Sequence, residues 1–593
     1  MRFRDIVFII LCIAAAAGLA FWGSRRLDNI NAQRSEMKLI MNQPLENAPP
    51  SLAFATVALG AFRGLIVDIL WLRADQLKEE GKFFDAKQLA EWITILQPRF
   101  AEVWNFHAWN MAYNISVAIP ASRPQERWQW VKNGIELLRD KGIEKNPRSI
   151  ILYHELGWIF QQKIGGVTDD VHKYYKLQLY HSMKPLVEPQ TEEHFKGLAA
   201  APQSLDEILQ KPDVAKFVKE LASADNAFAK PGELVDNYLS LRQQPQRFSK
   251  EAFAVIDNYR NTKTLEDFDT FAKAYYLRHT WKLEPQLMVQ LNEKYGPIDY
   301  KDPNKLLPLD WTLPDSQAIY WASLGLQRAS KPEFSTDELN TDRIVFHSIQ
   351  NLYRQGKMVV YTSRMPAKDD PCNIIERESV FLFPDLRMFD RYEQTLRALM
   401  GKYKKLEGNV ESLQIAHKNM LKHAILLFYQ AGNIDKAAEI YKTVKEEYPE
   451  DRDIQRPFFE YVKETLIREL STMGITDVSE ILALLLREAY YRYAVHEDEE
   501  AYGRERLARE IYDQYEKQLK NYEEGVDRVQ LPDFEVLRYI GITGFLSDQR
   551  YPDFVRQNLV ERLRIERPEL YEKMNQQNEF FMREMEKQES QQK

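Results

Sequence analysis

Two stretches far apart in the chain space glycine, alanine and proline identically. The two sets are Gly81, Ala86 and Pro98, and then Gly432, Ala437 and Pro449. Glycine permits a tight turn, a small alanine lets two helices pack closely, and proline ends the second helix. The shared spacing predicts two helical hairpins of one kind, and a chain that repeats such hairpins stacks them into an all-α solenoid.

A second pattern joins an aromatic residue, a leucine-glycine pair and a further apolar position at helical spacing. It occurs at Tyr153, Leu156, Gly157 and Phe160, shortly after Pro147, and again at Trp321, Leu324 and Gly325. The glycine allows a neighbouring helix to approach, and the aromatic side chains fill the space beside it. His154 and Glu155 do not form a zinc-protease motif, because Trp158 stands where the second histidine is required. We therefore interpret this stretch as architectural.

These motifs resemble the tetratricopeptide-repeat (TPR) superfamily, whose unit is two antiparallel helices in about 34 residues. The resemblance covers residues 67–185, 318–360 and 418–451. The segments 59–77 and 89–116 also look like a group of bacterial membrane-anchored TPR-like proteins of unassigned function. The resemblance implies a superhelical scaffold that binds segments of other proteins, and it implies no catalytic residue.

Composition narrows the possible functions. At 593 residues the chain is too long for one compact core, and its net charge of −8 argues against nucleic-acid binding. Its two cysteines cannot form a disulfide framework or a four-thiolate metal site. No phosphate loop, GxGxxG or GxSxG motif occurs, and the histidines are scattered. We expect no catalytic residue, no metal and no cofactor.

The N-terminus predicts a membrane anchor. Residues 6–22 carry no charge and precede Arg25 and Arg26, and a helix of this length just spans a bilayer. Cleavage as a signal peptide near Ala20 is the alternative. The predicted location is the cytoplasmic (inner) membrane, single-pass. The body is placed on the extracytoplasmic side, although the positive charges after the span favour the opposite orientation.

The chain divides into segments of different character. In order, we predict a membrane anchor at 1–26, a linker at 27–50, TPR-like repeats at 51–189, an irregular Pro-punctuated helical insertion at 190–317, a helical repeat at 318–361, an irregular link at 362–386, a TPR-like repeat at 387–451, C-terminal helices at 452–575 and a polar tail at 576–593. The predicted fold class is therefore one N-terminal transmembrane helix followed by an all-α, TPR-like solenoid of stacked hairpins with an irregular insertion.

Aromatic and basic side chains crowd the first third of the body. The candidates for contact with a partner protein are Trp104, Trp109, Tyr113, Arg127, Trp128 and Trp130. Trp, Tyr and Arg dominate binding hot spots. Packing between helices is the alternative and carries more weight for the aromatics. Arg127, beside two tryptophans, is expected to be exposed.

The predicted function is a membrane-anchored scaffold that mediates protein–protein interactions in the assembly or stabilisation of a cell-envelope complex. Its expected partners are membrane or envelope proteins and, through residues 6–22, the lipid bilayer, but not nucleic acid. One alternative is a structural subunit of a permanent membrane-associated array. The other is an envelope polysaccharide or lipid enzyme with a site in 190–317, although no motif supports catalysis.

Overall fold

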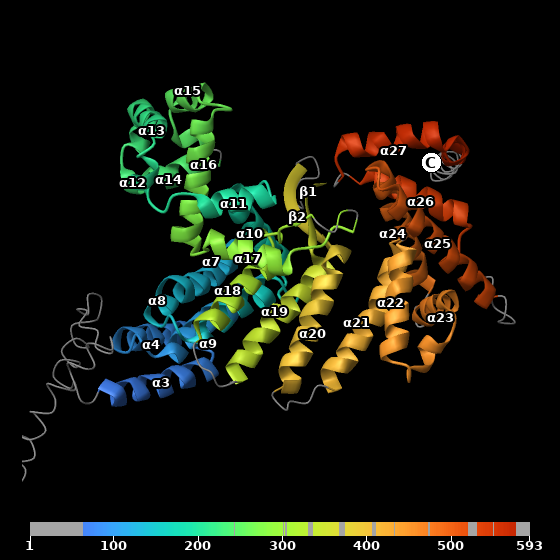
Figure 1. The fold of residues 1–593 in the computed structure, drawn as a ribbon, viewed down its shortest axis with the longest axis horizontal. Coiled ribbons are helices and arrows are strands. Elements are labelled where there is room, and N and C mark those ends of the chain that lie inside the picture. The colour runs from blue at the N-terminus through green and yellow to red at the C-terminus, as the bar shows by residue number, and fades with distance from the viewer. Residues whose placement is uncertain are drawn as a thin grey trace, which may run out of the picture. The chain divides into compact units, whose positions relative to one another are not determined.

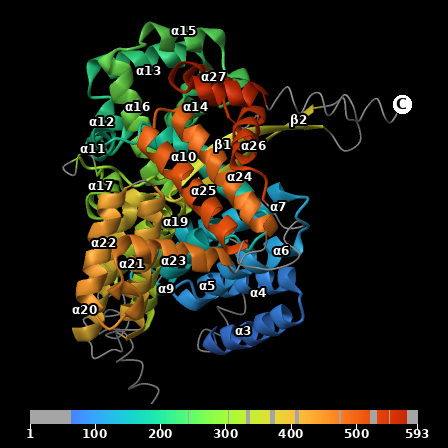
Figure 2. The same ribbon diagram turned by 90° about the vertical axis from the view of Figure 1, so that its right-hand side faces the viewer.

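A computed structural model describes residues 63–576, apart from positions 242, 301, 303–304, 330–335, 367–373, 406–410, 432, 472–474, 520–530 and 549–550. The chain separates into two compact units, Met1–Phe100 and Ala101–Lys593. Figures 1 and 2 show the ribbon from two directions. Helices dominate both units, and the structural class of the described chain is all-α with one added β-hairpin.

The described part of the first unit, residues 63–100, contains one antiparallel pair of helices, α3 (Arg63–Glu79) and α4 (Phe83–Leu96). Gly81 lies in the connection with φ of +75°, a left-handed conformation that favours glycine. Ala86 on α4 is fully buried. The glycine and the alanine of the first spaced set therefore occupy the turn and the packed helix of one hairpin.

One turn recurs after three helices. Its backbone hydrogen bonds, each 3.0 Å, run from Phe100 N to Gln97 O, from Ser149 N to Asn146 O and from Asp451 N to Tyr448 O. The second residue of each turn is Pro98, Pro147 or Pro449, and the fixed φ of proline suits that position. The Tyr153 hydroxyl donates to the Pro147 carbonyl at 2.9 Å, and Gln455 Nε2 donates to the Pro449 carbonyl at 2.7 Å. The prolines thus end helices in a repeated geometry.

The second unit begins with long helices that contain π-helical segments. They are α5 (Ala101–Trp109), η2 (Asn110–Ile115) and α6 (Ser116–Ala118); α7 (Pro124–Glu136), η3 (Leu137–Gly142) and α8 (Ile143–Lys145); α9 (Ile150–Trp158) and η4 (Ile159–Ile164); and α10 (His172–Val187). The π-helical turn is rare and occurs often at functional sites. Leu156 and Phe160 are buried on the continuous helix formed by α9 and η4.

Residues 190–317 form short helices. They are α11 (Glu192–Ala200), α12 (Leu205–Ile208), α13 (Pro212–Ala224), η5 (Asn226–Phe228), α14 (Pro231–Ser240), η6 (Pro245–Arg247), α15 (Lys250–Asn258), α16 (Lys263–Tyr276), η7 (Leu277–Trp281) and α17 (Pro285–Tyr295). Proline begins α13, α14 and α17, where its missing N–H costs nothing. Helices α12 to α16 enclose a small core of their own, which includes Phe217, Phe268 and Phe271.

Helix α9 packs against two helices that come much later in the chain, α18 (Pro314–Arg328) and α19 (Thr336–Gln355). A Cβ atom at Gly325 would lie 2.5 Å from the Tyr153 Cβ, and one at Gly157 would lie 3.4 Å from the Ala318 carbonyl oxygen. Both glycines therefore serve a close approach of helices, as their spacing predicts. The helix that approaches, however, is not the next one along the chain.

We expect Gly325→Ala to destabilise the protein by about 1–3 kcal/mol, the usual cost of overpacking. The added methyl group would overlap Tyr153, which is fully buried and cannot move aside freely. Gly401 is the matched control, because a Cβ atom there meets nothing within 4 Å. Gly401→Ala should stabilise its helix by about 0.5–1 kcal/mol. Urea unfolding followed by tryptophan fluorescence measures both, and equal effects would contradict the close approach at Gly325.

A β-hairpin occupies most of the segment predicted to be an irregular link. Strands β1 (Lys357–Pro366) and β2 (Ile374–Phe383) are antiparallel, in a register that runs from Lys357 opposite Phe383 to Pro366 opposite Ile374. The prediction of a link at 362–386, and of a repeat that continues to 361, is wrong here. The runs MVVYT and VFLF are rich in β-branched and aromatic residues, which favour strands.

The remaining helices are α20 (Phe389–Lys405), α21 (Glu411–Gln430), α22 (Ile434–Glu447), α23 (Phe458–Ser471), α24 (Ile475–Ala494), α25 (Asp498–Leu519), α26 (Phe534–Ser547) and α27 (Asp553–Glu566), with 3₁₀ turns η8 (Leu386–Met388) and η9 (Arg452–Gln455). Helices α18 to α21 lie side by side in chain order (Figure 1). Helices α25 and α26 both pack against α24 (Figure 2). Ala437 on α22 is fully buried, and Gly432 lies outside the described residues.

The predicted fold class needs correction in three respects. No helix among the described residues is both long and apolar enough to cross a membrane, and the predicted anchor at 6–22 lies outside them. The hairpins do not stack in simple succession, because α9 is covered by α18 and α19. A β-hairpin interrupts the helices. What the structure does show is a predominantly helical, repeat-like architecture.

Candidate functional site

The six residues predicted to contact a partner do not form one surface. Trp104 is buried in the core, and Trp128 and Trp130 are half-buried on α7. The Trp128 ring packs against Tyr175 at 5.9 Å between centroids. Arg127 is buried as well, and its Nε donates to the Ile119 carbonyl at 2.6 Å. The expectation that Arg127 is exposed is therefore wrong.

Arg127 belongs to a buried ion cluster with Lys163 and Asp169, which we call the Asp169 cluster. Arg127 Nη1 donates to Asp169 Oδ1 at 3.1 Å, and Lys163 Nζ donates to Oδ2 at 2.5 Å. The Val171 amide and the Tyr175 hydroxyl donate to the same carboxylate at 3.0 and 3.3 Å. Burial works to raise the pKa of Asp169, but the hydrogen bonds from Lys163 and Val171 outweigh it and hold the pKa below its usual value. One carboxylate thus satisfies two buried cations.

Four aromatic rings near the candidate residues form two stacked pairs on adjacent helices. Trp109 and Tyr113 stack with their centroids 5.5 Å apart, and His154 and Trp158 stack at 6.2 Å. The first pair lies on α5 and η2, and the second lies on α9, which packs against α5. Both tryptophans leave 37% of their surface exposed. Trp109 and Trp158 are therefore available to a partner, whereas the other candidate aromatics are largely used in packing.

A pocket of about 350 Å³ opens beside the second pair, between α9, η4 and α19. We call it the Glu155 pocket, and its lining residues are His154, Glu155, Trp158, Gln161, Asn340, Arg343, Ile344 and His347. Gln161 joins the two walls, because its Nε2 donates to the Ile344 carbonyl at 2.8 Å and to Ser348 Oγ at 2.7 Å. The polar face of α19 and one face of α9 therefore form a single fixed site.

Glu155 is the unusual group in this pocket. Its side chain is buried, and its Oε1 has no hydrogen-bond partner among the described residues. Burial raises the pKa of Glu155 from 4.5 to about 8, so the carboxyl group is mostly protonated at neutral pH. Burial, followed by the nearby Glu155 carboxylate, also raises the pKa of Tyr113. A buried polar atom without a partner is costly unless a ligand or partner group meets it.

Both histidines of the pocket favour the neutral form. Burial lowers the pKa of His154, and Asp337 only partly opposes this effect. Burial also lowers the pKa of His347, with Arg343 acting in the same direction. In the part of the chain that the structure describes, no three His, Cys, Asp or Glu side chains converge closely enough to hold a metal ion. The lining residues offer hydrogen-bonding groups and aromatic rings.

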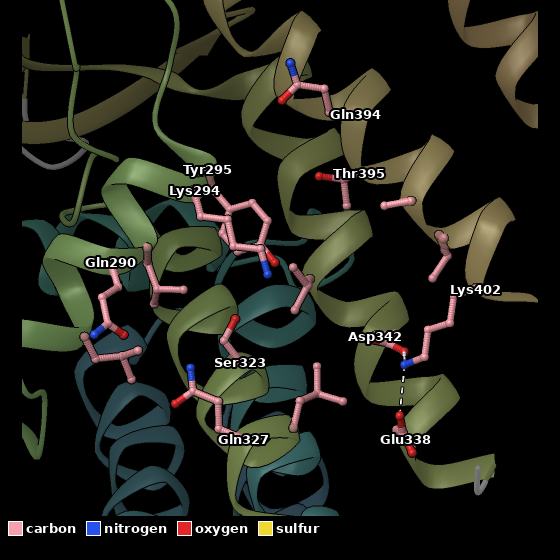
Figure 3. A pocket seen from close by; sticks show the side chains of 16 residues that line it. Gln290, Lys294, Tyr295, Ser323, Gln327, Glu338, Asp342, Gln394, Thr395 and Lys402 are labelled. Carbon is pink, nitrogen blue, oxygen red and sulfur yellow. Dashed lines mark hydrogen bonds and ion pairs between the residues drawn. The ribbon is translucent and has the colours of Figure 1, made fainter.

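A larger cleft of about 670 Å³ lies between α17, α18, α19 and α20 (Figure 3). Lys402 points across it from α20 and pairs with Glu338, at 2.9 Å, and with Asp342, both on α19. Burial raises the pKa of Asp342, and the hydrogen bond from Lys402 opposes this effect. These charges already compensate one another. The Glu155 carboxyl group, in contrast, has no such partner.

Sequence reasoning identified Trp109 and Tyr113 but missed the pocket beside them. Glu155 did carry a signal, because it is the one acidic residue in the apolar run ILYHELGWIF. Asn340, Arg343 and His347 carried none, since they lie on the polar face of an ordinary amphipathic helix. Only the packing of α19 on α9 brings these α19 residues next to Glu155.

No protein-family model matches the chain, and no curated protein matches it. Among solved structures, the chain is similar to one described as "Circular tandem repeat protein with novel repeat topology and enhanced subunit contact surfaces", with a TM-score of 0.16 and 10% sequence identity over 90% of this chain and 99% of that chain. A TM-score of this size does not indicate a shared fold. The likeness to TPR proteins stays a resemblance, and the helical hairpins rest on the structure itself.

Proposed function

We propose that this chain is a protein-interaction scaffold and that a segment of another protein binds across its two aromatic pairs. The observation that carries the proposal is the position of these pairs. Trp109 and Trp158 are half-exposed on adjacent helices, and each stacks on a less exposed ring, Tyr113 or His154. Trp158 and His154 line a pocket together with Glu155, whose buried Oε1 lacks a hydrogen-bond partner among the described residues. Tryptophan and tyrosine are enriched among the residues that dominate binding energy in protein interfaces.

The fold supports the same function. Helices such as α18 to α21 pack side by side, as the helices of repeat scaffolds do. The Gln161 bridge and the buried Tyr153 hold the aromatic pairs on rigid helices, so little ordering is needed when a partner binds. A cell-envelope complex as the setting, and a location at the cytoplasmic membrane, rest on residues outside the described part and stay predictions.

Site-specific photocrosslinking tests the proposal. The residue p-benzoylphenylalanine is placed at position 158 or at position 109, and at Phe554 on α27 as a control, because Phe554 is an exposed aromatic on a distant helix. We expect positions 158 and 109 to capture the same partner segment and position 554 not to capture it. A synthetic peptide of the captured segment should block the crosslink. Equal capture from all three positions, or none from 158 and 109, would contradict the proposal.

Alanine substitution measures how much Trp158 contributes to the binding free energy. Trp158→Ala should weaken binding of the captured peptide by tenfold or more, since truncation of a hot-spot residue costs about 2 kcal/mol. Stability should change little, because Trp158 is partly exposed. Phe554→Ala is the control and should leave affinity unchanged. Isothermal titration measures the affinity, and thermal unfolding checks the fold.

A further inference from the structure

The Glu155 pocket has a chemistry of its own. Glu155, whose Oε1 is buried without a hydrogen-bond partner among the described residues, lines it together with the stacked rings of His154 and Trp158. Aromatic faces attract cations, because the face of the ring carries negative charge density. A carboxyl group next to an aromatic wall therefore combines two features that favour the same kind of ligand.

We propose that the Glu155 pocket receives a cationic side chain, a lysine or an arginine, from the bound segment. The inference rests on the proposed function, since it names the chemistry of the partner at that site. The ammonium or guanidinium group would donate to Glu155 Oε1 and lie against the Trp158 ring. The aliphatic stem would extend past Ile344 toward the mouth of the pocket, which suits the amphipathic side chains of lysine and arginine.

The charges around the pocket agree with this ligand. Arg343 is the permanent cation among the lining residues, and it lies on the exposed side of α19. The charge of Asp337, at the N-terminal end of α19, works to raise the pKa of His154. Once Glu155 ionises, the carboxylates of Glu155 and Asp337 carry two negative charges, and Arg343 carries one positive charge. A cation from the partner then restores the balance.

Several other titratable groups lie on the elements packed around Glu155. They are His107 and Tyr113 on α5 and η2, Arg139 and Asp140 on η3, Lys163 on η4, Asp315 and Arg328 on α18, and Asp337, Arg343 and His347 on α19, besides His154 on α9 itself. Arg139 and Asp140 pair at 2.7 Å, Lys163 pairs with Asp169, and Arg328 bonds to the Tyr153 hydroxyl. These three cations are therefore already engaged.

Binding of a cation requires ionised Glu155, which gives the interaction a defined pH dependence. Burial raises the pKa of Glu155 to about 8 in the free protein. Below that pH, each binding event must release one proton, so affinity should rise about tenfold per pH unit and level off above pH 8. Lysine keeps its charge over this range, because its pKa is about 10.4.

Small model ions test the inference without knowledge of the partner. The probes are n-butylammonium and n-butylguanidinium, with butyrate and butyramide as controls at matched ionic strength. Full-length protein labelled with 5-fluorotryptophan reports binding by ¹⁹F NMR, and Trp158→Phe assigns the Trp158 resonance. We expect the two cations to shift that resonance saturably, and we expect butyrate and butyramide not to shift it.

Two variants separate the role of the carboxyl group from a change in fold. Glu155→Gln keeps the shape of the protonated side chain and should weaken cation binding at pH 8 at least tenfold. Glu144→Gln makes the same chemical change on an exposed surface and should have no effect. If Glu155→Gln fails to fold, the pH dependence of binding to the unmodified protein still decides the question.

Several results would overturn the inference. They are a shift by butyrate alone, no saturable shift by any probe, equal cation affinity in Glu155→Gln, or affinity that falls as pH rises. Crosslinking from position 158 does not depend on ligand charge. Capture of a partner together with no cation binding would therefore reject this inference and leave the scaffold function standing. Cation binding without capture of a partner would reject the scaffold function, and it would leave only a pocket that binds cations.

Discussion

Asp169→Asn should destabilise the second unit by about 3–5 kcal/mol, the cost of leaving a buried charge without its partner. Arg127 and Lys163 would remain buried, and the neutral amide would no longer balance them. Asp170→Asn is a control of identical chemistry one residue away, on an exposed side chain. It should change stability by less than about 0.5 kcal/mol. The measurement is the urea midpoint followed by tryptophan fluorescence.

A second substitution tests whether the loss comes from unbalanced charge. Adding Lys163→Met to Asp169→Asn removes one of the stranded cations, so the double variant should be more stable than the sum of the single losses implies. Local hydrogen exchange at η4 and α7, the elements that carry Lys163 and Arg127, should rank the variants in the same order of stability as urea unfolding does. Simple additivity would show that the three side chains do not act as one cluster.

The second large effect is a fall in stability with rising pH that depends on Glu155. Its pKa is 4.5 in an exposed carboxyl group and about 8 in the folded protein. Between these values the folded state keeps a proton that the unfolded state has released, so the folded state loses relative stability as pH rises. One pKa unit corresponds to about 1.4 kcal/mol, so the whole effect is on the order of 5 kcal/mol.

Glu155→Gln isolates this contribution. The variant lacks the titration, so it should match the unmodified protein in stability near pH 4.5 and become progressively more stable than it up to about pH 8. Other titrating groups are common to both proteins and cancel in the comparison. Urea unfolding at several pH values measures the difference. A difference that stays constant with pH would show that the Glu155 carboxyl group has an ordinary pKa.

Local features of the fold followed from local sequence. The turns at Pro147 and Pro449 could be predicted because a proline acts on its own neighbours through its fixed φ. The close approach at Gly325 could be predicted because only a glycine leaves room for it. The identity of the neighbour could not, since spacing along a helix does not say which helix will cover it. Tyr153 fills the gap at Gly325 from a distant part of the chain.

In the candidate site, too, local features could be predicted from the sequence and contacts between distant segments could not. Trp109 and Tyr113 could be selected as aromatics at helical spacing, and the structure places Trp109 half-exposed and Tyr113 half-buried against the core. Arg127 was misjudged because its partner, Asp169, lies 42 residues away in the chain. Arg343 and Glu155 come together only through the contact between α9 and α19. Burial by distant segments decides which polar side chains become reactive or available, and no single stretch of sequence contains that information.

The late covering of α9 also bears on how the protein is made. Gln161 bonds to Ser348, which is synthesised 187 residues later. At about 5–20 residues per second, the ribosome takes on the order of ten to forty seconds to supply that partner. During this interval α5 can already pack against α9, but the face of α9 that α18 and α19 later cover stays bare. We therefore expect ribosome-bound chains that end between α10 and α18 to bind general chaperones, and chains that extend beyond α19 to release them.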